Sequence, residues 1–472
     1  MYLTINNFLH KFVLSFNQFY GNRMTIQRHI QKKLISAIST NKIQLIMGPR
    51  YVGKHDLLNR VIQHLREEQK VPSERIFHFS LDDILVQLEF IEDFSHFVND
   101  IENRIGQPIT GLSEPVYFFF DQIQNYLSLA ELIVSLYTTN PDKIKIIISS
   151  SVNLENDKTY QKTLAQHTNV LHLYPLSLYE LIRNDIAPIN GESVLSTIFK
   201  GKFDLEYFEY IQWIVEPYKD AVLNFFQEYL LYGGLPAIFR HDDAQTRWIE
   251  LKNSLRQYLQ RDIRTVYQIS DLKKFDSILK ILSTNNGDIL NLLNLCDFYQ
   301  INRNTIRKYS GILHDTFTLE YVPPFLKEKV QKPIMRTPKV YFLNTGLLNY
   351  LNKIDSFEKL IQAPEFSRLL ESALFVNLKN TMHQLDSKFD IFFMKDYQEH
   401  EIDFLVSTPE NLIPIGITWE SEQKKVKIKT FKYYLRYCKR ISDGVVFGKF
   451  DKIELLEMRG SRLFLLPLWM LW

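Results

Sequence analysis

The chain has 472 residues, of which 45% are hydrophobic and 23% are charged, and its formal net charge is +2 at pH 7. This length favours about three domains, and the composition is ordinary for a globular protein with several buried cores. The net charge argues neither for nor against nucleic-acid binding, which must rest on local patches. Two distant cysteines, Cys296 and Cys438, have no metal-ligand spacing, which excludes a disulfide framework and indicates a cytoplasmic protein.

Neither end of the chain predicts a membrane segment, so no membrane partner is expected. The apolar residues of 1–23 are interrupted by asparagine, histidine and lysine, a pattern typical of a weak amphipathic extension and not of a signal peptide. The apolar stretch 463–472 is about half as long as the roughly 20 residues of a membrane-spanning helix. We expect a terminal core strand there.

A glycine-rich loop is the first candidate site. The ATP-binding residues predicted in it are Gly48, Pro49, Arg50, Tyr51, Val52, Gly53, Lys54 and His55. The loop lies between a predicted buried strand at 43–47 and a predicted helix at 56–65, as phosphate binding at a helix N-terminus requires. The phosphate-loop pattern ends in Lys followed by Ser or Thr, whose hydroxyl ligates Mg²⁺. His55 replaces that hydroxyl.

An acidic strand end supplies the second half of such a site. The apolar run 116–120 leads to Asp121, the residue type that holds Mg²⁺ in these sites. Gln122 follows at the position of the catalytic base, and an amide cannot accept the proton. Because a positioned base contributes about 10²- to 10⁴-fold in rate, we expect weak hydrolysis or none. Ser149 and Ser150 follow another buried strand and are candidate γ-phosphate sensors.

Five segments are expected along the chain. Strands alternate with helices over 24–175, which predicts an α/β fold with a P-loop NTPase core built on a parallel sheet. The extension at 1–23 precedes this core. A helical lid at 176–265, a winged helix at 266–345 and a second α/β domain at 346–472 are expected to follow it.

A helix-turn-helix is predicted within the winged helix, from short helical stretches at 295–299 and 304–309. Arg303, Arg307 and Lys308 lie on its second helix. Basic residues of the expected wing follow at Lys327, Lys329, Lys332, Arg336 and Lys339. These cations either contact DNA phosphates without reading sequence or form the solvated face of a purely structural domain.

The last domain contains acidic residues and a basic segment. Glu371 lies on a predicted helix at 366–378, and Asp403 lies on a predicted strand at 401–406. The segment 424–440 interleaves lysine and arginine with aromatic residues, a composition that can track phosphates and stack bases. We favour the simpler interpretation, a helix with one solvated basic face and one buried aromatic face.

These landmarks resemble, in the same order, a family of prokaryotic AAA-type P-loop ATPases. Members have a winged helix and a C-terminal domain similar to restriction endonucleases of the PD-(D/E)xK kind. The motifs that carry the resemblance lie at 48–54, 121–124, 175–177, 233–236, 338–342, 345–347, 369–371 and 401–404.

The sequence departs from that family at its chemical groups. Where the family has Lys-Thr, Asp-Glu and Glu-Val-Lys, this chain has Lys54-His55, Asp121-Gln122 and Gly416-Ile417-Thr418. The resemblance therefore implies a degenerate nuclease site, in which Glu371 and Asp403 remain while Gly416 and Thr418 replace a carboxylate and a lysine. It also implies a pseudoenzyme that keeps the fold.

Three functions remain open from the sequence. The favoured one is an ATP- or ADP-binding protein with little or no hydrolysis and an inactive nuclease-like domain, which serves as a DNA- or protein-binding module or assembles with its own copies. The second is an active ATPase with altered metal use that acts on DNA, because the His55 imidazole suits Zn²⁺ or Mn²⁺. The third is a structural or interaction protein with an empty nucleotide site, in which Lys54 pairs with Asp121.

Overall fold

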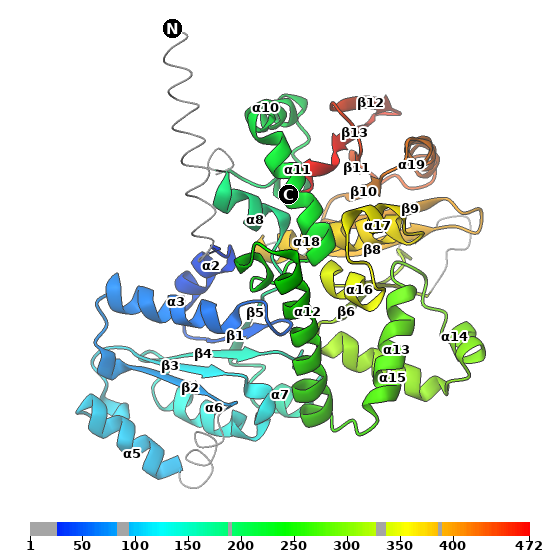
Figure 1. Ribbon diagram of the computed structural model, residues 1–472. Coiled ribbons are helices and arrows are strands. Elements are labelled where there is room, and N and C mark those ends of the chain that lie inside the picture. The colour runs from blue at the N-terminus through cyan, green and yellow to red at the C-terminus, as the bar shows by residue number, and fades with distance from the viewer. Residues whose placement is uncertain (1–25, 83–93, 187–190, 327–336, 386–388) are drawn as a thin grey trace.

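A computed structural model describes residues 26–82, 94–186, 191–326, 337–385 and 389–472 (Figure 1). The predicted extension at 1–23 and the expected wing residues Lys327, Lys329, Lys332 and Arg336 lie outside these ranges. The described chain contains a parallel sheet with its helices, a helical region, and a mixed sheet at the C-terminal end. No helix in these ranges is long and apolar enough to cross a membrane.

The N-terminal unit is a five-stranded parallel sheet in the order β2-β3-β4-β1-β5. Its strands are β1 (Ile43–Met47), β2 (Ile76–Ser80), β3 (Val116–Asp121), β4 (Ile144–Ser150) and β5 (Thr168–His172). Helices α2 (Ile30–Ala37) and α3 (Lys54–Glu67) lie over one face, and α5 (Phe94–Ile105), α6 (Ala130–Thr139) and α7 (Lys158–Lys162) lie over the other (Figure 1). The predicted α/β core with a parallel P-loop sheet is confirmed.

The burial of the strands agrees with their positions in the sheet. Residues of β1, β3 and β4 are buried along their whole length, as expected where helices cover both faces of a parallel sheet. Phe118 of β3 stacks on Phe77 of β2, with ring centroids 5.2 Å apart. Strand β5 lies at the edge of the sheet and was not predicted. Only Leu171 in it is buried, and its sequence has few apolar residues to indicate a strand.

The helices after the core are shared between two neighbours. They are α8 (Leu178–Asp185), α9 (Val194–Phe199), α10 (Leu205–Val215), α11 (Lys219–Tyr232) and α12 (Ala244–Tyr258), and α12 passes into a π-helix, η7 (Leu259–Val266). Phe203 and Phe208 contact Phe464 of the C-terminal sheet, with ring centroids 5.7 Å and 5.3 Å apart. The first part of the expected lid therefore packs on the C-terminal unit, while α12 runs beside the parallel sheet (Figure 1).

The helix-turn-helix has the helices expected from the sequence. It consists of α14 (Leu292–Tyr299) and α15 (Arg303–Asp315). Helix α13 (Leu272–Thr284) precedes it, and the antiparallel pair β6 (Leu319–Val322) and β7 (Lys339–Phe342) follows it. The Asn302 side chain accepts a hydrogen bond from the Asn304 amide and caps α15. Asparagine satisfies a free amide at a helix start, so the second helix begins there.

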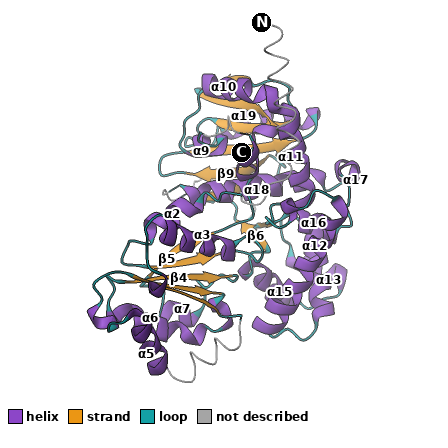
Figure 2. Ribbon diagram, turned by 60° about the vertical axis from the view of Figure 1, so that its left-hand side comes forward, coloured by secondary structure: helices purple, strands orange, loops and turns teal. Residues whose placement is uncertain are grey.

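The C-terminal unit is a six-stranded mixed sheet in the order β12-β13-β11-β10-β9-β8. Its elements are α16 (Thr345–Leu351), α17 (Phe357–Gln362), α18 (Phe366–Gln384), β8 (Asp390–Lys395), β9 (Glu401–Ser407), β10 (Leu412–Thr418), α19 (Ser421–Tyr434), β11 (Gly444–Gly448), β12 (Glu454–Met458) and β13 (Ser461–Pro467). Helix α18 lies between this sheet and the rest of the molecule (Figure 2). The chain ends buried at Trp472, after the core strand predicted for this region.

Candidate functional site

The glycine loop joins β1 to α3, as predicted. Gly53 has a φ of +91°, in the left-handed region that favours glycine, and a Cβ on Gly48 would lie 2.0 Å from the Leu173 carbonyl oxygen. Both positions therefore require glycine. The Lys54 side chain is buried, and its Nζ donates to the carbonyls of Gly48 at 2.7 Å and Pro49 at 2.8 Å. The ammonium group thus lies inside the loop.

Burial changes the ionisation of Lys54. Loss of hydration lowers the pKa of its ammonium group to about 7, although the nearby Asp121 carboxylate acts in the opposite direction. Burial disfavours the charged form of any ionisable group, whereas a nearby opposite charge favours it. A phosphate bound in the loop would therefore raise this pKa again.

Asp121 is engaged by other side chains of the protein. His55 Nδ1 lies 2.9 Å from Asp121 Oδ2, and Ser149 Oγ donates to Asp121 Oδ1. Both carboxylate oxygens thus have protein partners. The alternative in which Lys54 pairs with Asp121 is not the arrangement found, because Lys54 contacts loop carbonyls.

Gln122 is held in a fixed conformation at the end of β3. Its φ of +66° lies in the left-handed region. Residues other than glycine rarely adopt this conformation, and those that do are concentrated at functional sites. Its amide oxygen accepts hydrogen bonds from Ser151 Oγ at 2.6 Å and Gln124 Nε2 at 2.6 Å. Ser150, named as a sensor candidate, instead donates to the Val152 carbonyl at 2.7 Å.

The loop also contacts the end of α12, at Gln257, and the π-helix η7 that follows it, at Asp262. Arg50 Nε lies 2.5 Å from Asp262 Oδ2, and the Tyr51 hydroxyl donates to Gln257 Oε1 at 2.8 Å. Burial raises the pKa of Asp262, and Arg50 opposes that rise. Sequence reasoning missed Asp262 because 212 positions separate it from Arg50 and no local pattern connects them.

His78 is another residue that the sequence analysis did not select. It lies on β2, two positions before Ser80, whose partner in the parallel pairing is Asp121. Side chains two positions apart on a strand share a face, so His78 and Asp121 lie on the same face of the sheet. The His55 and His78 rings have centroids 5.5 Å apart.

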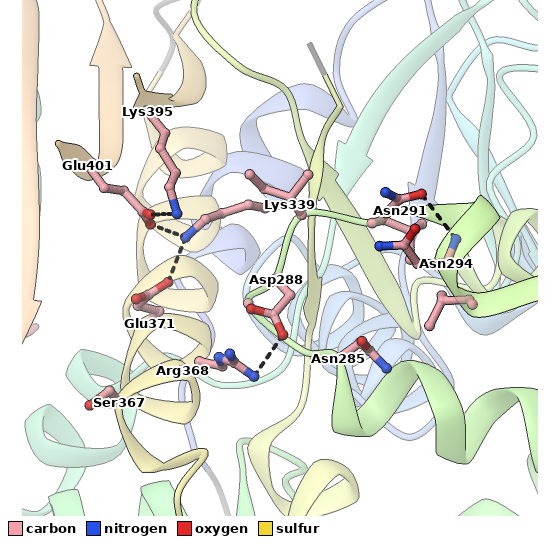
Figure 3. A pocket seen from close by; sticks show the side chains of 14 residues that line it. Asn285, Asp288, Asn291, Asn294, Lys339, Ser367, Arg368, Glu371, Lys395 and Glu401 are labelled. Carbon is pink, nitrogen blue, oxygen red and sulfur yellow. Dashed lines mark hydrogen bonds and ion pairs between the residues drawn. The ribbon is translucent and has the colours of Figure 1, made fainter. Parts of the chain in front are cut away.

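A second cluster of charged residues lies in the C-terminal unit. Glu371 of α18 and Glu401 and Asp403 of β9 each place a carboxylate oxygen within 4.8 Å of the others. Lys339 Nζ lies 3.3 Å from Glu371 Oε2 and also contacts Glu401 (Figure 3). Lys427 of α19 contacts the remaining carboxylate, Asp403. Each carboxylate therefore has a lysine partner.

The structure corrects two expectations about this cluster. No lysine was predicted for the degenerate site, because Thr418 stands on β10 at the position where one is expected, but Lys427 on the next helix reaches Asp403. A Cβ at Gly416 would lie 3.3 Å from Asp403 Oδ2 and 3.7 Å from Lys427 Cδ, so glycine leaves room for this approach. The Thr418 hydroxyl instead donates a hydrogen bond to the Glu420 carbonyl at 3.1 Å.

Lys339 is the second correction. It was expected in a DNA-contacting wing, but it is only 4% exposed and pairs with Glu371 and Glu401. Nearby carboxylates raise the pKa of this lysine well above its usual range even though burial acts in the opposite direction. Its sequence neighbours gave no indication of these partners, which lie on α18 and β9.

A cavity of about 520 Å³ opens beside this cluster, between the helix-turn-helix and the C-terminal unit (Figure 3). Lys339, Glu371, Lys395 and Glu401 line one side of it. The segment 285–295 lines the other side. Asp288 and Arg368 form an ion pair of 2.7 Å across its edge.

The two basic segments are placed differently. Arg303, Arg307 and Lys308 are all exposed on α15, so the structure leaves these candidate DNA contacts accessible. On α19, Phe431 and Tyr434 are buried while Lys425, Lys429 and Lys432 are exposed. This is the arrangement favoured from the sequence, a solvated basic face opposite a buried aromatic face.

Comparison with protein families identifies three segments. Residues 40–182 match the model of an AAA domain, residues 223–358 match a domain of unknown function, DUF8612, and residues 366–470 match another, DUF4143. The AAA-type part of the resemblance inferred from the sequence is thereby confirmed. An AAA domain implies nucleotide binding.

An uncharacterised protein of Methanocaldococcus jannaschii, MJ1544, is 23% identical over 420 residues, which cover 88% of this chain and 82% of the relative. Among solved structures, the Aeropyrum pernix ORC1 protein in complex with DNA is 13% identical, with 72% of this chain and 95% of that chain covered and a TM-score of 0.28. For C. elegans PCH-2 the identity is 16%, 35% of this chain and 49% of that chain are covered, and the TM-score is 0.25. Values this low mark a distant likeness and indicate nothing about function.

Proposed function

We propose that this AAA-type protein binds ATP or ADP and hydrolyses ATP weakly or not at all. The proposal rests on a contrast between the phosphate-binding part of the site and the positions for the metal and the base. The loop glycines and Lys54 have the placement that phosphate binding needs, whereas Asp121 and Gln122, the positions for metal and base, are held by protein side chains.

The chemistry of the replaced groups supports binding without turnover. Mg²⁺ prefers oxygen ligands, and His55 offers nitrogen where the pattern has a hydroxyl. Gln122 has no proton-accepting oxygen of the carboxylate kind, and its amide is fixed by Ser151 and Gln124. Bound nucleotide would therefore keep its phosphate contacts but lack an activated water.

The contacts of the loop supply a route by which bound nucleotide changes the rest of the molecule. Arg50 and Tyr51 are loop residues, and their partners Asp262 and Gln257 lie on the helical region. A phosphate in the loop competes with Asp262 for the Arg50 guanidinium, because both are anions. We infer that nucleotide binding alters this contact, so that the chain is a nucleotide-dependent binding module for DNA or a protein partner.

The nuclease-like domain is proposed to be inactive. The support is the position of Lys339, whose Nζ lies between Glu371 and Glu401, where a divalent cation would need both carboxylates. The second candidate function, metal-dependent phosphodiester cleavage, is favoured by the approach of three carboxylates and Lys427. Metal-assisted cleavage needs a carboxylate cluster and a group beside the attacking water.

Calorimetric titration with ADP and ATP, with and without Mg²⁺, tests the proposed function. We expect saturable binding to the wild type with modest Mg²⁺ dependence, loss of binding in Lys54→Ala, and unchanged binding in His64→Ala, a control on the same helix. Negligible heats in both the wild type and Lys54→Ala would contradict nucleotide binding.

Incubation of plasmid DNA with Mg²⁺ or Mn²⁺ tests the inactive nuclease. We expect no nicking by the wild type. Nicking that disappears in Asp403→Ala and persists in Asp443→Ala would establish the second candidate instead.

A further inference from the structure

His55, His78 and Asp121 come together from three different elements. His55 lies on the first turn of α3, His78 on β2 and Asp121 at the end of β3. Each offers one ligand atom, and these atoms all lie within 4.8 Å of one another. The set is compact although the three residues are widely separated in the sequence.

The donor set indicates which kind of cation it fits. Two imidazole nitrogens and one carboxylate oxygen match borderline transition metals such as Zn²⁺, and they suit Mg²⁺ poorly. Tetrahedral Zn²⁺ with bonds of about 2.0–2.2 Å places its ligand atoms about 3.3 Å apart. His55 Nδ1 and Asp121 Oδ2 are 2.9 Å apart, so this pair already has nearly the required separation.

The surroundings of the cluster favour the same cation. Ser149 donates to the second oxygen of Asp121, the kind of supporting hydrogen bond that orients a ligating carboxylate. Burial lowers the pKa of His78, with a further contribution from His55, while the Asp121 carboxylate acts in the opposite direction. The His55 side chain is 61% exposed, so this side of the cluster is accessible to solvent and to a further ligand.

We propose that His55, His78 and Asp121 bind one transition-metal dication of the Zn²⁺ class, at the position where related phosphate loops place Mg²⁺. Three protein ligands and an open position are the arrangement of metal sites that accept a further ligand. Lys54 and the loop amides adjoin the cluster, so a phosphate oxygen is the natural fourth ligand. The metal site itself needs no nucleotide, and it goes beyond the proposed nucleotide-binding function.

The test is titration of metal-free protein with Zn²⁺ and Co²⁺ in the absence of nucleotide. Affinity for Zn²⁺ is measured by competition with a chromophoric chelator, and Co²⁺ coordination is followed by its visible absorption. The variants are His78→Asn and His55→Asn. The control is His64→Asn. His64 lies on the same helix as His55, and its Nδ1 is 3.1 Å from Glu68 Oε2. It therefore forms a histidine–carboxylate pair that lacks the second histidine of the cluster.

We expect one site per chain in the wild type and in His64→Asn. Loss of either cluster histidine should weaken binding by at least about tenfold, the lower bound for loss of even a supporting group around a metal. Equal affinity and stoichiometry in the wild type, His78→Asn and His55→Asn would overturn the proposal. Both histidines are exposed, and thermal unfolding of each variant checks that the fold is retained. Titration with ADP is a separate measurement, so failure of one leaves the other unaffected.

Discussion

At the scale of single residues, the nucleotide site combines retained and replaced groups. Lys54 is retained, and its burial gives the site an ionisable cation with a pKa of about 7. His55 and Gln122 are replacements, and each makes specific contacts, with Asp121 and with Ser151. Both replacements are therefore tied into the structure by hydrogen bonds to neighbouring side chains.

The lowered pKa of Lys54 predicts that nucleotide binding depends on pH. Phosphate binds the ammonium form, so protein in which Lys54 is neutral must take up a proton on binding. Below pH 7 the ammonium already predominates and little uptake occurs; above pH 7 uptake approaches one proton. From linkage, ADP affinity should fall about fiftyfold between pH 7 and pH 9.

Calorimetry in two buffers of different ionisation enthalpy measures this proton uptake directly. His55→Gln removes the imidazole next to Lys54 and should retain the uptake at pH 8.5. Binding at that pH without proton uptake would contradict the role assigned to Lys54.

At the scale of elements, the contact between the phosphate loop and the end of α12 is central. Asp262 is 1% exposed and is paired with Arg50, whose side chain is 8% exposed. One oxygen of Asp262 is buried without a hydrogen-bond partner among the described residues. This contact is thus a buried ion pair in which one carboxylate oxygen lacks a hydrogen bond. Such a pair adds little to the stability of the folded state, but removal of one partner is strongly destabilising.

Asp262→Ala should therefore destabilise the protein markedly. Removal of one partner from a buried pair leaves an uncompensated charge and costs about 3–5 kcal/mol, which thermal or denaturant unfolding measures. The matched control is Asp276→Ala, which breaks an exposed pair with Lys280 at i,i+4; such pairs contribute about 0.3–0.5 kcal/mol. Equal destabilisation by the two substitutions would contradict the importance of the loop contact.

The sequence predicted those elements whose signal is local. Strands β1, β3 and β4 are rich in apolar residues, and the two helices of the helix-turn-helix are separated by a capped turn. Residues that act through distant partners were not predictable. Asp262 and His78 fall in this group.

Lys427 shows the same limit in the C-terminal site. Its position within a run of lysines gave it the pattern of a solvated helix face, but packing of α19 on the sheet turns it to Asp403. No spacing rule on one strand could have located a lysine that the following helix supplies.

At the scale of the whole molecule, elements from separate parts of the sequence pack into the same unit. Helices α9 and α10 come before the helix-turn-helix in the sequence but pack beside the C-terminal sheet. The cavity beside Lys339 and Glu371 is likewise lined from two units. Helix α12 packs on α16, and η7 packs on α13, so the end of α12 that contacts the phosphate loop also contacts both neighbouring units.

The exposed cations of α15 predict sequence-independent DNA binding. The triple variant Arg303→Ala, Arg307→Ala, Lys308→Ala should weaken binding to a short duplex and lower the salt slope by about one for each phosphate contact removed. Fluorescence anisotropy at several salt concentrations measures both quantities. The control carries Lys425→Ala, Lys429→Ala and Lys432→Ala on α19. A larger loss in the control, or no binding by the wild type at low salt, would contradict the prediction.

ATP hydrolysis by the intact chain tests the central claim most directly, because the claim is that binding has been kept while turnover has been lost. The measurement compares the wild type, Lys54→Ala and the double variant His55→Thr, Gln122→Glu, in Mg²⁺ and separately in Mn²⁺ and Zn²⁺. We expect the wild type to hydrolyse ATP no faster than Lys54→Ala with any of these metals. The double variant, which regains a hydroxyl ligand and a base that act together, should exceed the wild type by at least about 10²-fold in Mg²⁺. Hydrolysis by the wild type at a rate that Lys54→Ala abolishes would contradict the account.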